Sequence, residues 1–441
     1  MHPRVRDRAA PALDLAGLAA ALVDRKTGAI ARLEVLPRTA DQLRLAHLLA
    51  RVPDLARLPS AGAIVDPCGG RQTLEAAVRQ LLLECVERSC AAVTNHRSLI
   101  LARPTSDGAF ATLPQFSAEQ YATPGFPFRA VTEASRIWWA EGRSLVTGRP
   151  VFVPAALVFV PYMCTSEDEW LGPSTSTGMA CDATWSRAVI NGLLEVIERD
   201  AFAITWLNQL SHPRLTVAPW SPLGRELADI TRRHTGAISF VDITCDLQIP
   251  TVLAVFDARV RGERIVTVGA ACRPSRVEAA RKAMSEAVCD HLRIRDEIDA
   301  GAPSFVSAPA FANVTEWKWH SLVYLDPQVQ PALEFLTASP VTIDIDAPCG
   351  GPPSDGDDEI VLAWLVGELA RAGEDVIAVD LTTRDAEALG LHVVKIMVPG
   401  AVPLPPDHRY QPLGHRRIHT VPPRLGIAPA RELNRFPHPF A

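Results

Sequence analysis

Apolar residues recur along several long segments of the chain with the spacing of a helix. In Thr73–Val93 they stand at Leu74, Ala77, Val78, Leu81, Leu82 and Val86. Steps of three or four residues place these side chains on one face of an α-helix, the face that packs against a core. We expect further long helices at Thr184–Leu207 and Arg276–Arg295.

Shorter apolar segments bounded by turn residues predict strands. We expect strands at Ala29–Val35, Ile238–Ile243, Thr251–Phe256, Arg264–Val268, Asp375–Leu381 and His392–Val398, and a β-rich block at Pro150–Met163. Because strands and helices do not alternate strictly, we predict an α+β fold rather than a doubly wound parallel sheet. The last forty residues are dense in proline, and we expect them to lie extended over the surface.

Composition narrows the classes of function. The formal net charge is −6 and no basic stripe is present, so nothing indicates nucleic-acid binding. The apolar runs are too short to cross a bilayer, and the N-terminus is a poor signal peptide. The nine cysteines are scattered and form no C-x-x-C pair, which suits reduced thiols and a cytoplasmic protein. Neither a P-loop nor a Rossmann glycine motif occurs.

One short motif is repeated. The segment Leu82-Leu83-Glu84-Cys85-Val86-Glu87-Arg88 matches Leu193-Leu194-Glu195-Val196-Ile197-Glu198-Arg199 in its leucines, glutamates and arginine. The two glutamates of each copy are three residues apart, so both lie on one face of a helix whose other residues are mostly apolar. The third helix places Glu286 in a comparable setting.

A single Glu-x-x-Glu-Arg segment is usually a helix-stabilising ion pair. Two copies in apolar surroundings are different, because each arginine leaves one glutamate without a counter-charge, and burying a carboxylate costs several kcal/mol. A divalent cation would supply the missing charge. Mg²⁺ binds few carboxylates and completes its shell with phosphate oxygens and water. The pattern therefore favours a metal–phosphate site, with paired helix charges as the alternative.

These residues closely resemble the core motif of the YcaO family, above all the members that form azoline rings in ribosomally made peptides. The resemblance includes Ser176-Thr177-Gly178-Met179-Ala180, the second acidic helix through Asp200-Ala201-Phe202, and Gly69-Gly70-Arg71 before the first helix. It extends to Gly414-His415-Arg416-Arg417 and to the tail Phe436-Pro437-His438-Pro439-Phe440-Ala441. It covers roughly residues 24–441, which we treat as one domain preceded by an N-terminal arm or short helix at 1–23.

The resemblance implies a YcaO-type α+β fold whose acidic helices line an ATP site. It implies Mg²⁺ ligands at Glu84, Glu87, Glu195, Glu198 and Glu286. Nucleotide contacts are implied for Arg71, Ser176, Thr177, Gly178, Arg199 and His291, and a catalytic role for the tail residues Pro439 and Ala441. The implied activity is ATP-dependent cyclodehydration of Cys, Ser or Thr in a precursor peptide.

Some positions depart from the family pattern. Cys289 and His291 stand where the family has Gln and Arg, Arg71 where Lys is common, Asp182 where Gly is frequent, and Ala441 where a last proline is usual. We expect His291 either to donate a hydrogen bond to phosphate or to be a solvated helix residue.

The resemblance also implies a separate leader-peptide-binding partner of ThiF-like or winged-helix type. A flavin dehydrogenase that acts afterwards and a homodimeric assembly are further options. Two other functions stay open: thioamide or amidine formation with the same fold, and a scaffold that has lost turnover.

Overall fold

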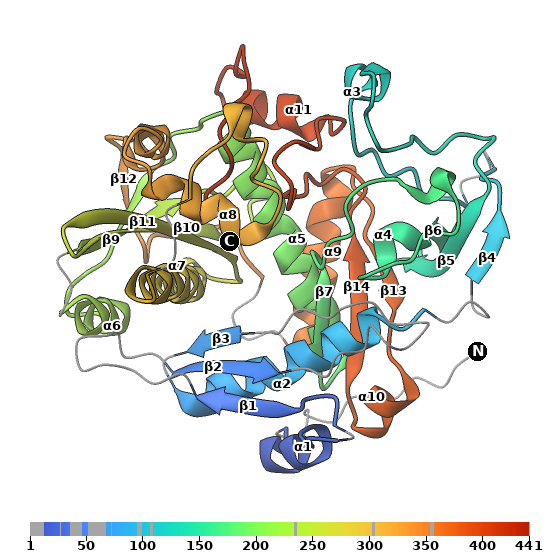
Figure 1. Cartoon of the computed structure of the whole chain (residues 1–441), viewed down its shortest axis with the longest axis horizontal. Coiled ribbons are helices and arrows are strands. Elements are labelled where there is room, and N and C mark those ends of the chain that lie inside the picture. Colours follow the sequence, from blue (N-terminus) through green and yellow to red (C-terminus); the bar gives the residue numbers. More distant parts are fainter. Residues whose placement is uncertain are drawn as a thin grey trace.

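The computed structural model describes residues 13–26, 28–35, 46–51, 68–71, 73–94, 99–105, 109–232, 236–301, 305–352 and 357–440. Its strands form three sheets, with helices packed between and against them (Figure 1). This mixed arrangement confirms the α+β prediction. Within the described residues, no helix combines the length and the apolar character needed to span a membrane.

The smallest sheet is antiparallel and contains β1 (Arg32–Val35), β2 (Ala46–Arg51) and β3 (Cys68–Arg71). Helix α2 (Leu74–Ala91) packs against β2 and β3. Helix α1 (Leu15–Leu22) occupies most of the described part of the expected N-terminal arm, of which residues 1–12 lie outside the described chain. Its residues Leu18 and Leu22 are buried in the same hydrophobic cluster as Leu81 of α2.

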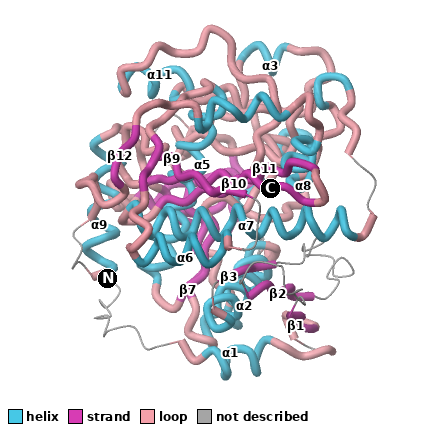
Figure 2. Tube along the Cα trace, turned by 90° about the vertical axis from the view of Figure 1, so that its left-hand side faces the viewer, coloured by secondary structure: helices cyan, strands magenta, loops and turns pink. Residues whose placement is uncertain are grey.

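A five-stranded sheet has the order β11 (Glu263–Cys272), β10 (Thr251–Val260), β9 (Gly236–Asp242), β8 (Arg214–Thr216) and β12 (Thr342–Asp344). Its neighbours are antiparallel except β8 and β12, which are parallel. Helix α7 (Arg276–Asp299) packs on β10 and β11, and α6 (Pro222–Thr231) on β9. In the side view, α7 runs beneath these strands (Figure 2).

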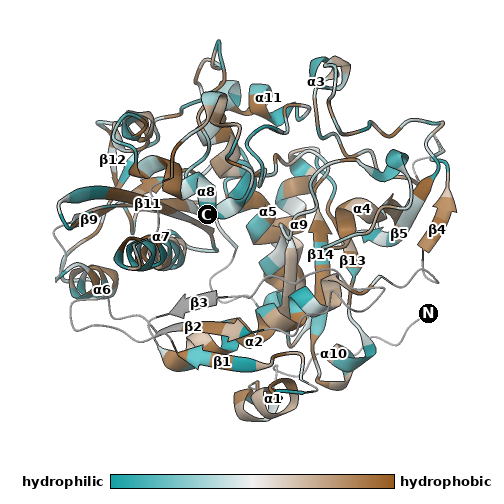
Figure 3. Ribbon diagram, viewed as in Figure 1, coloured by the Kyte–Doolittle hydropathy of each residue, from teal (hydrophilic) through white to brown (hydrophobic). Residues whose placement is uncertain are grey.

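The third sheet is antiparallel, with the order β4 (Leu99–Ala102), β5 (Ile137–Ser144), β13 (Ile377–Asp380), β14 (His392–Met397) and β7 (Met179–Asp182), while β6 (Pro150–Pro154) also pairs with β5. Helix α5 (Trp185–Leu207) contacts β14 and β7 of this sheet and β11 of the other. It therefore lies between the two larger sheets, and α9 (Asp358–Arg371) packs along it. Hydrophobic residues dominate α5, β13 and β14 (Figure 3). Their contact explains why α5 is almost wholly buried.

The remaining α-helices are short: α3 (Ala118–Ala122), α4 (Ala155–Val158), α8 (Trp317–Leu322), α10 (Arg384–Ala388) and α11 (Arg417–Arg424). Helix α4 corrects the expectation of a β-rich block at 150–163. Strand β6 ends at Pro154, which occupies the N-cap position of α4. Proline has no N–H to continue the ladder, and the following Ala155-Ala156 favours a helix.

The expectation of an extended, superficial C-terminal segment was also wrong. The segment contains α11, and its last four described residues, 437–440, are buried. Phe440 is only 5% exposed and packs on Phe202 of α5, with 5.2 Å between ring centroids. The prolines lower the helix content, but the aromatic residues between them have apolar surface to bury, so the segment is drawn into the core.

Candidate functional site

Three helices bring the five predicted glutamates to one cleft. Glu84 and Glu87 come from α2, Glu195 and Glu198 from α5, and Glu286 from α7, and all five line the same hollow. Its volume is about 1080 Å³. Sites for small molecules usually measure ~300–1,000 Å³, so this cleft has room for a nucleotide. We call this hollow the acidic cleft.

Each helix begins with a hydroxyl cap that fixes where its glutamates fall. Thr73 accepts a hydrogen bond from Ala76 N, Thr184 from Arg187 N, and Ser275 from Glu278 N. A cap of this kind satisfies one of the free N–H groups of the first turn. In each helix the apolar face packs against the core, and the glutamates lie on the face that borders the acidic cleft.

Glu198 is the most buried of the five, with only 2% of its side chain exposed. Burial raises its pKa to about 7, opposed by Lys282 and Arg199 and reinforced by the charges of Glu286 and Glu195. The Lys282 ammonium lies 3.2 Å from Glu198 Oε2 and 2.8 Å from Glu286 Oε1. The cleft thus holds a carboxylate that is only partly compensated by protein cations.

Glu87 is in a similar position on the facing helix. Burial raises its pKa well above the usual value for a glutamate; Arg88 opposes the shift, while Glu84 and Glu195 add to it. Because the charge of Glu195 raises the pKa of Glu87, the two motif copies interact electrostatically across the cleft. An additional cation between them would stabilise all of these carboxylates.

The two motif arginines make matching contacts. Arg88 lies 3.4 Å from Glu84 and 3.9 Å from Glu87, and Arg199 lies 3.6 Å from Glu195 and 3.9 Å from Glu198. None of these is a short bidentate pair. Arg199 also lies over aromatic rings, 4.8 Å from the centroid of Phe440 and 5.2 Å from that of Trp317. Phe440 lines the acidic cleft, so the C-terminal segment forms part of its wall.

The 174–178 loop closes another side of the acidic cleft. Ser176 lines it, and Gly178 N donates a hydrogen bond of 3.0 Å to Glu195 Oε2. Gly178 has a φ of +82°, and a Cβ added there would lie 2.2 Å from Ile396 O. Only glycine fits this turn and this close approach. Thr177 does not line the acidic cleft; it faces a separate, smaller pocket.

His291 is not where either expectation placed it. It is fully buried, its ring centroid is 4.6 Å from that of Phe256, and it does not line the acidic cleft. The helical period explains this, because α7 turns one face to the cleft with Lys282, Glu286, Cys289, Asp290 and Arg293. His291 instead shares the buried face with Met284, Ala287 and Ile294.

The other expected site residues are placed only in part. Pro439 is buried next to Phe440 but does not itself line the acidic cleft. Arg71 ends β3, and its side chain lies outside what the structure describes. Ala441 lies outside the described residues, so its catalytic role stays a prediction.

Several cleft residues were not found from the sequence. Gln80, Asn191 and Lys282 each stand four positions before a motif glutamate and share its helix face. A polar residue four positions before each glutamate could have predicted that these side chains also line the cleft. Asp182 also lines the acidic cleft and accepts hydrogen bonds of 3.2 Å from Arg79 Nη2 and Asn191 Nδ2.

The donor set fits magnesium. Among the described residues, no three His, Cys, Asp or Glu side chains converge closely enough to hold a metal ion by themselves. Mg²⁺ commonly takes only one or two carboxylates and completes its shell with phosphate oxygens and water. Buried carboxylates with raised pKa values, together with the buried Gln80 Oε1, which has no hydrogen-bond partner among the described groups, provide suitable oxygen ligands.

Residues 68–402 match the model of a family described as YcaO cyclodehydratase, ATP- and Mg²⁺-binding. The chain belongs to this family. The match covers most of the chain, including the three acidic helices. It confirms the family resemblance, and with it ATP and Mg²⁺ as the family's cofactors.

Solved structures agree with this fold. A heterocyclase in complex with substrate and cofactor matches 97% of this chain and 57% of its own, with a TM-score of 0.77 and 22% identity. The YcaO protein of Methanopyrus kandleri, bound with AMPPCP and Mg²⁺, matches 85% of this chain and 86% of its own, with a TM-score of 0.62 and 23% identity. At these identities the likeness establishes the fold.

A curated relative is an uncharacterized protein in the tfuA 3′ region of Rhizobium leguminosarum bv. trifolii. It is 32% identical over 164 residues, which are 35% of this chain and 39% of the relative. The chain therefore spans well under two thirds of that relative, and likewise of the heterocyclase.

Proposed function

We propose that the protein is an ATP-dependent cyclodehydratase that converts Cys, or Ser and Thr, of a precursor peptide into thiazoline or oxazoline. The observation that carries the proposal is the convergence of five glutamates from three helices on one nucleotide-sized cleft. Membership of a family whose description names cyclodehydration, ATP and Mg²⁺ supports the same reaction class.

The proposed reaction has three steps. The side-chain thiol or hydroxyl of the peptide adds to the preceding carbonyl carbon and loses its proton. The resulting oxyanion attacks the γ-phosphorus of ATP, and ADP leaves. The amide nitrogen then forms a C=N bond as phosphate departs and the N–H proton is lost. Phosphorylation is needed because the amide oxygen is a poor leaving group and phosphate a good one. The peptide loses one water, and ATP becomes ADP and phosphate.

In this scheme Glu84, Glu87, Glu195, Glu198 and Glu286 would hold Mg²⁺ ions, with one or two carboxylates for each ion. When bound, Mg²⁺ would neutralise phosphate charge and stabilise the transferring phosphoryl group. Ser176 and Arg199 contact the nucleotide, since both line the acidic cleft. Gly178 acts indirectly, because its N–H orients the Glu195 carboxylate. Thr177 and His291 are left out of the nucleotide site.

Nucleotide binding gives the first test. We expect Mg-AMPPCP to raise the melting temperature of the purified protein, and AMPPCP with excess EDTA to raise it much less. At a hundred times the Kd, a ligand stabilises the folded state by about 2.7 kcal/mol. Glu198→Gln should remove this stabilisation. Glu278→Gln on the exposed first turn of α7 is the matched control and should retain it. Equal stabilisation of both variants would refute the metal assignment.

Turnover gives the second test. We incubate the protein and its partner with Mg-ATP and candidate precursor peptides. The masses of the peptides are then measured by mass spectrometry. Loss of ~18 Da per modified residue, the mass of one water, supports cyclodehydration. A gain from sulfide incorporation would indicate thioamide formation instead. Nucleotide binding without any mass change across the candidate peptides would indicate a scaffold.

We further propose that the leader of the precursor peptide is recognised by a separate ThiF-like or winged-helix protein. The E. coli microcin synthetase McbBCD complex contains a chain of similar fold, which supports a role beside a partner protein. The eight cysteines whose side chains are described form no disulfide, which supports a reducing compartment such as the cytoplasm.

A further inference from the structure

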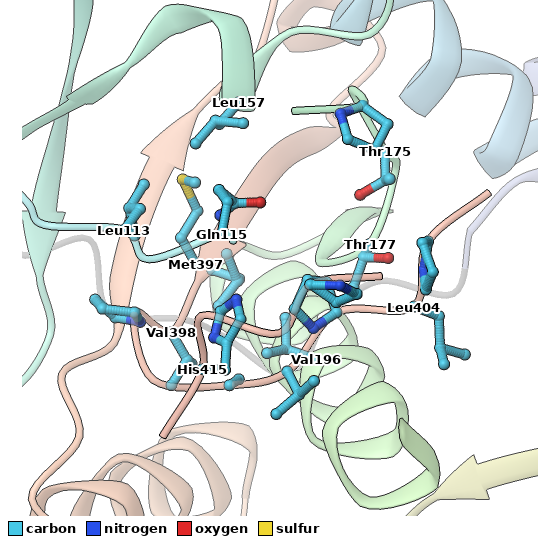
Figure 4. Close-up of a pocket in the computed structure, with 18 of the residues that line it drawn as sticks. Leu113, Gln115, Leu157, Thr175, Thr177, Val196, Met397, Val398, Leu404 and His415 are labelled. Carbon is cyan, nitrogen blue, oxygen red and sulfur yellow. The ribbon is translucent and has the colours of Figure 1, made fainter. Parts of the chain in front are cut away.

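A second pocket lies beside the acidic cleft, and we call it the side pocket. The two hollows share walls. Thr175 and Thr177 line the side pocket, whereas Ser176 between them lines the acidic cleft. On α5, Val196 likewise faces the side pocket while Glu195 and Glu198 face the cleft. Figure 4 shows Thr175, Thr177 and Val196 around the side pocket. Whatever binds here is therefore one loop away from the proposed reaction centre.

The lining of the side pocket is largely apolar. It includes Leu113, Leu157, Met397, Val398 and Leu404, which Figure 4 shows around it. Lys395 is the one charged residue among those that line it, and its ammonium already donates a 2.7 Å hydrogen bond to Thr175 O. Lys395 also interacts electrostatically with Glu195 and Glu87. Because Glu195 and Glu87 on the cleft side offset the charge of Lys395, the side pocket is unsuited to an ionic ligand.

Size excludes a nucleotide. The side pocket measures about 100 Å³. By comparison, a dry cavity of ~150 Å³ holds benzene with its six carbons. Scaled by volume, the side pocket holds about four carbons, which corresponds to an aliphatic side chain such as that of leucine or valine.

One buried histidine, His415, stands in the wall of the side pocket. His415 is 3% exposed, and burial lowers its pKa to about 4, so the ring is neutral. Its Nδ1 lies 3.4 Å from Gly400 O, and we assign the ring hydrogen to Nδ1. Nε2 has no hydrogen-bond partner among the described residues and is closed off from solvent, so the neutral ring gives the wall no charge and no accessible acceptor. Figure 4 shows the ring among the side chains that surround the pocket.

We propose that the side pocket binds the aliphatic side chain of a residue adjacent to the modified residue of the peptide substrate. The proposal rests on the proposed function, because it requires a peptide substrate at the acidic cleft. It assigns a sequence preference to the enzyme: an aliphatic neighbour is accepted and an acidic neighbour is not.

Photo-crosslinking tests this assignment. The probes are acetyl-Gly-photoleucine-Cys-Gly-amide and acetyl-Gly-Cys-photoleucine-Gly-amide, in which photoleucine is a diazirine analogue of leucine. They are irradiated with the protein and Mg-AMPPCP, and the labelled tryptic peptides are mapped. We expect labels from at least one probe within 113–116, 395–405 or 410–415. Excess acetyl-Gly-Leu-Cys-Gly-amide should suppress labelling, and the same peptide with Asp in place of Leu should not.

Two variants sharpen the test. Leu113→Trp fills the side pocket and should lower labelling at least fivefold, whereas Leu101→Trp, on the exposed β4, should leave it unchanged. If Leu113→Trp does not fold, competition by the Leu peptide and by its Asp counterpart decides.

Labels outside these segments, equal competition by the Leu and Asp peptides, or labelling unchanged in folded Leu113→Trp would overturn the proposal. Its failure is distinguishable from failure of the proposed function. If Mg-AMPPCP stabilises the wild type but the label falls elsewhere, only the side-pocket assignment is wrong. If Mg-AMPPCP does not stabilise the wild type, the proposed function is wrong, whatever the label shows.

Discussion

Arg417 of α11 forms a bidentate ion pair with Asp200 of α5, with Nε 3.1 Å from Oδ1 and Nη2 2.7 Å from Oδ2. Both side chains are almost completely buried. Asp200 directly follows Arg199, and its Oδ1 also accepts a hydrogen bond of 2.9 Å from Val402 N. The second motif helix is therefore fastened to the C-terminal part of the chain immediately next to the acidic cleft.

Removing the arginine of this pair should be costly. Arg417→Met leaves Asp200 and Asp246 without their shared buried counter-charge, so we expect the free energy of unfolding to fall by about 3–5 kcal/mol. Urea denaturation followed by circular dichroism measures the loss. Arg409→Met is the control, because Arg409 is half exposed and its pairing with Asp407 should contribute less than about 1 kcal/mol. Equal losses in the two variants would contradict this account.

Glu198 should make stability depend on pH when magnesium and nucleotide are absent. Its pKa is about 7 in the folded protein against 4.5 for an ordinary glutamate, so between these pH values the folded state keeps a proton that the unfolded state has lost. The free energy of unfolding should therefore decrease as pH rises from about 4.5 to about 7. A shift of this size corresponds to about 3 kcal/mol.

Glu198→Gln tests this assignment, because it removes the titrating group but keeps the shape. We expect the variant to lose less stability than the wild type between pH 4.5 and 7, when both are measured in EDTA. Glu278→Gln, on the exposed first turn of α7, should retain the full decrease. A Glu198→Gln profile parallel to that of the wild type would show that the carboxylate is ionised throughout.

Gly178 and Gly262 form a matched pair for testing the loop beside the acidic cleft. Both have positive φ, +82° and +90°, but a Cβ at Gly262 meets nothing within 4 Å, whereas one at Gly178 lies 2.2 Å from Ile396 O. Gly262→Ala should cost about 1–2 kcal/mol from the backbone conformation alone. Gly178→Ala should cost more and should also weaken Mg-AMPPCP binding, because the Gly178 N–H orients Glu195. Similar losses at both sites would argue against the close approach.

The ring of Phe440 should contribute to nucleotide binding through Arg199. Phe440→Leu keeps most of the buried volume, so we expect a stability loss below about 1.5 kcal/mol. Losing the cation–π contact, worth about 0.5–2 kcal/mol, should weaken Mg-AMPPCP binding several-fold in a calorimetric titration. Phe436→Leu removes a ring of the same segment that does not line the acidic cleft, and should leave the Kd unchanged.

The long helices could be predicted because their signals are local. Apolar spacing and hydroxyl caps define α2, α5 and α7. The repeated motif identified the glutamates of α2 and α5 as candidate ligands. The burial of His291 was also readable, since it falls in helical register with Met284, Ala287 and Ile294. The two expectations for His291, a phosphate contact taken from its family counterpart and a solvated helix position, were wrong because neither considered the helix face.

Other features had no local signal. Asp200 and Arg417 are 217 residues apart, and nothing near either residue specifies the other. The division of the 174–178 loop, with Ser176 facing one hollow and Thr177 the other, depends on the backbone path of an irregular segment, which follows no period. The proline-rich segment looked superficial because proline content suggests extended chain, whereas its burial depends on distant partners such as Phe202.

The pairing of Arg417 with Asp200 also bears on the order of events during synthesis. Helix α5 leaves the ribosome long before α11, and until α11 arrives Asp200 has no arginine to offset its charge. Contacts between such distant segments form late in folding because the intervening chain must first be brought together. The wall of the acidic cleft that contains Phe440 is completed later still. A nascent chain should therefore acquire nucleotide binding only after the segment that contains Arg417 and Phe440 has been made, so that shorter nascent chains do not bind ATP.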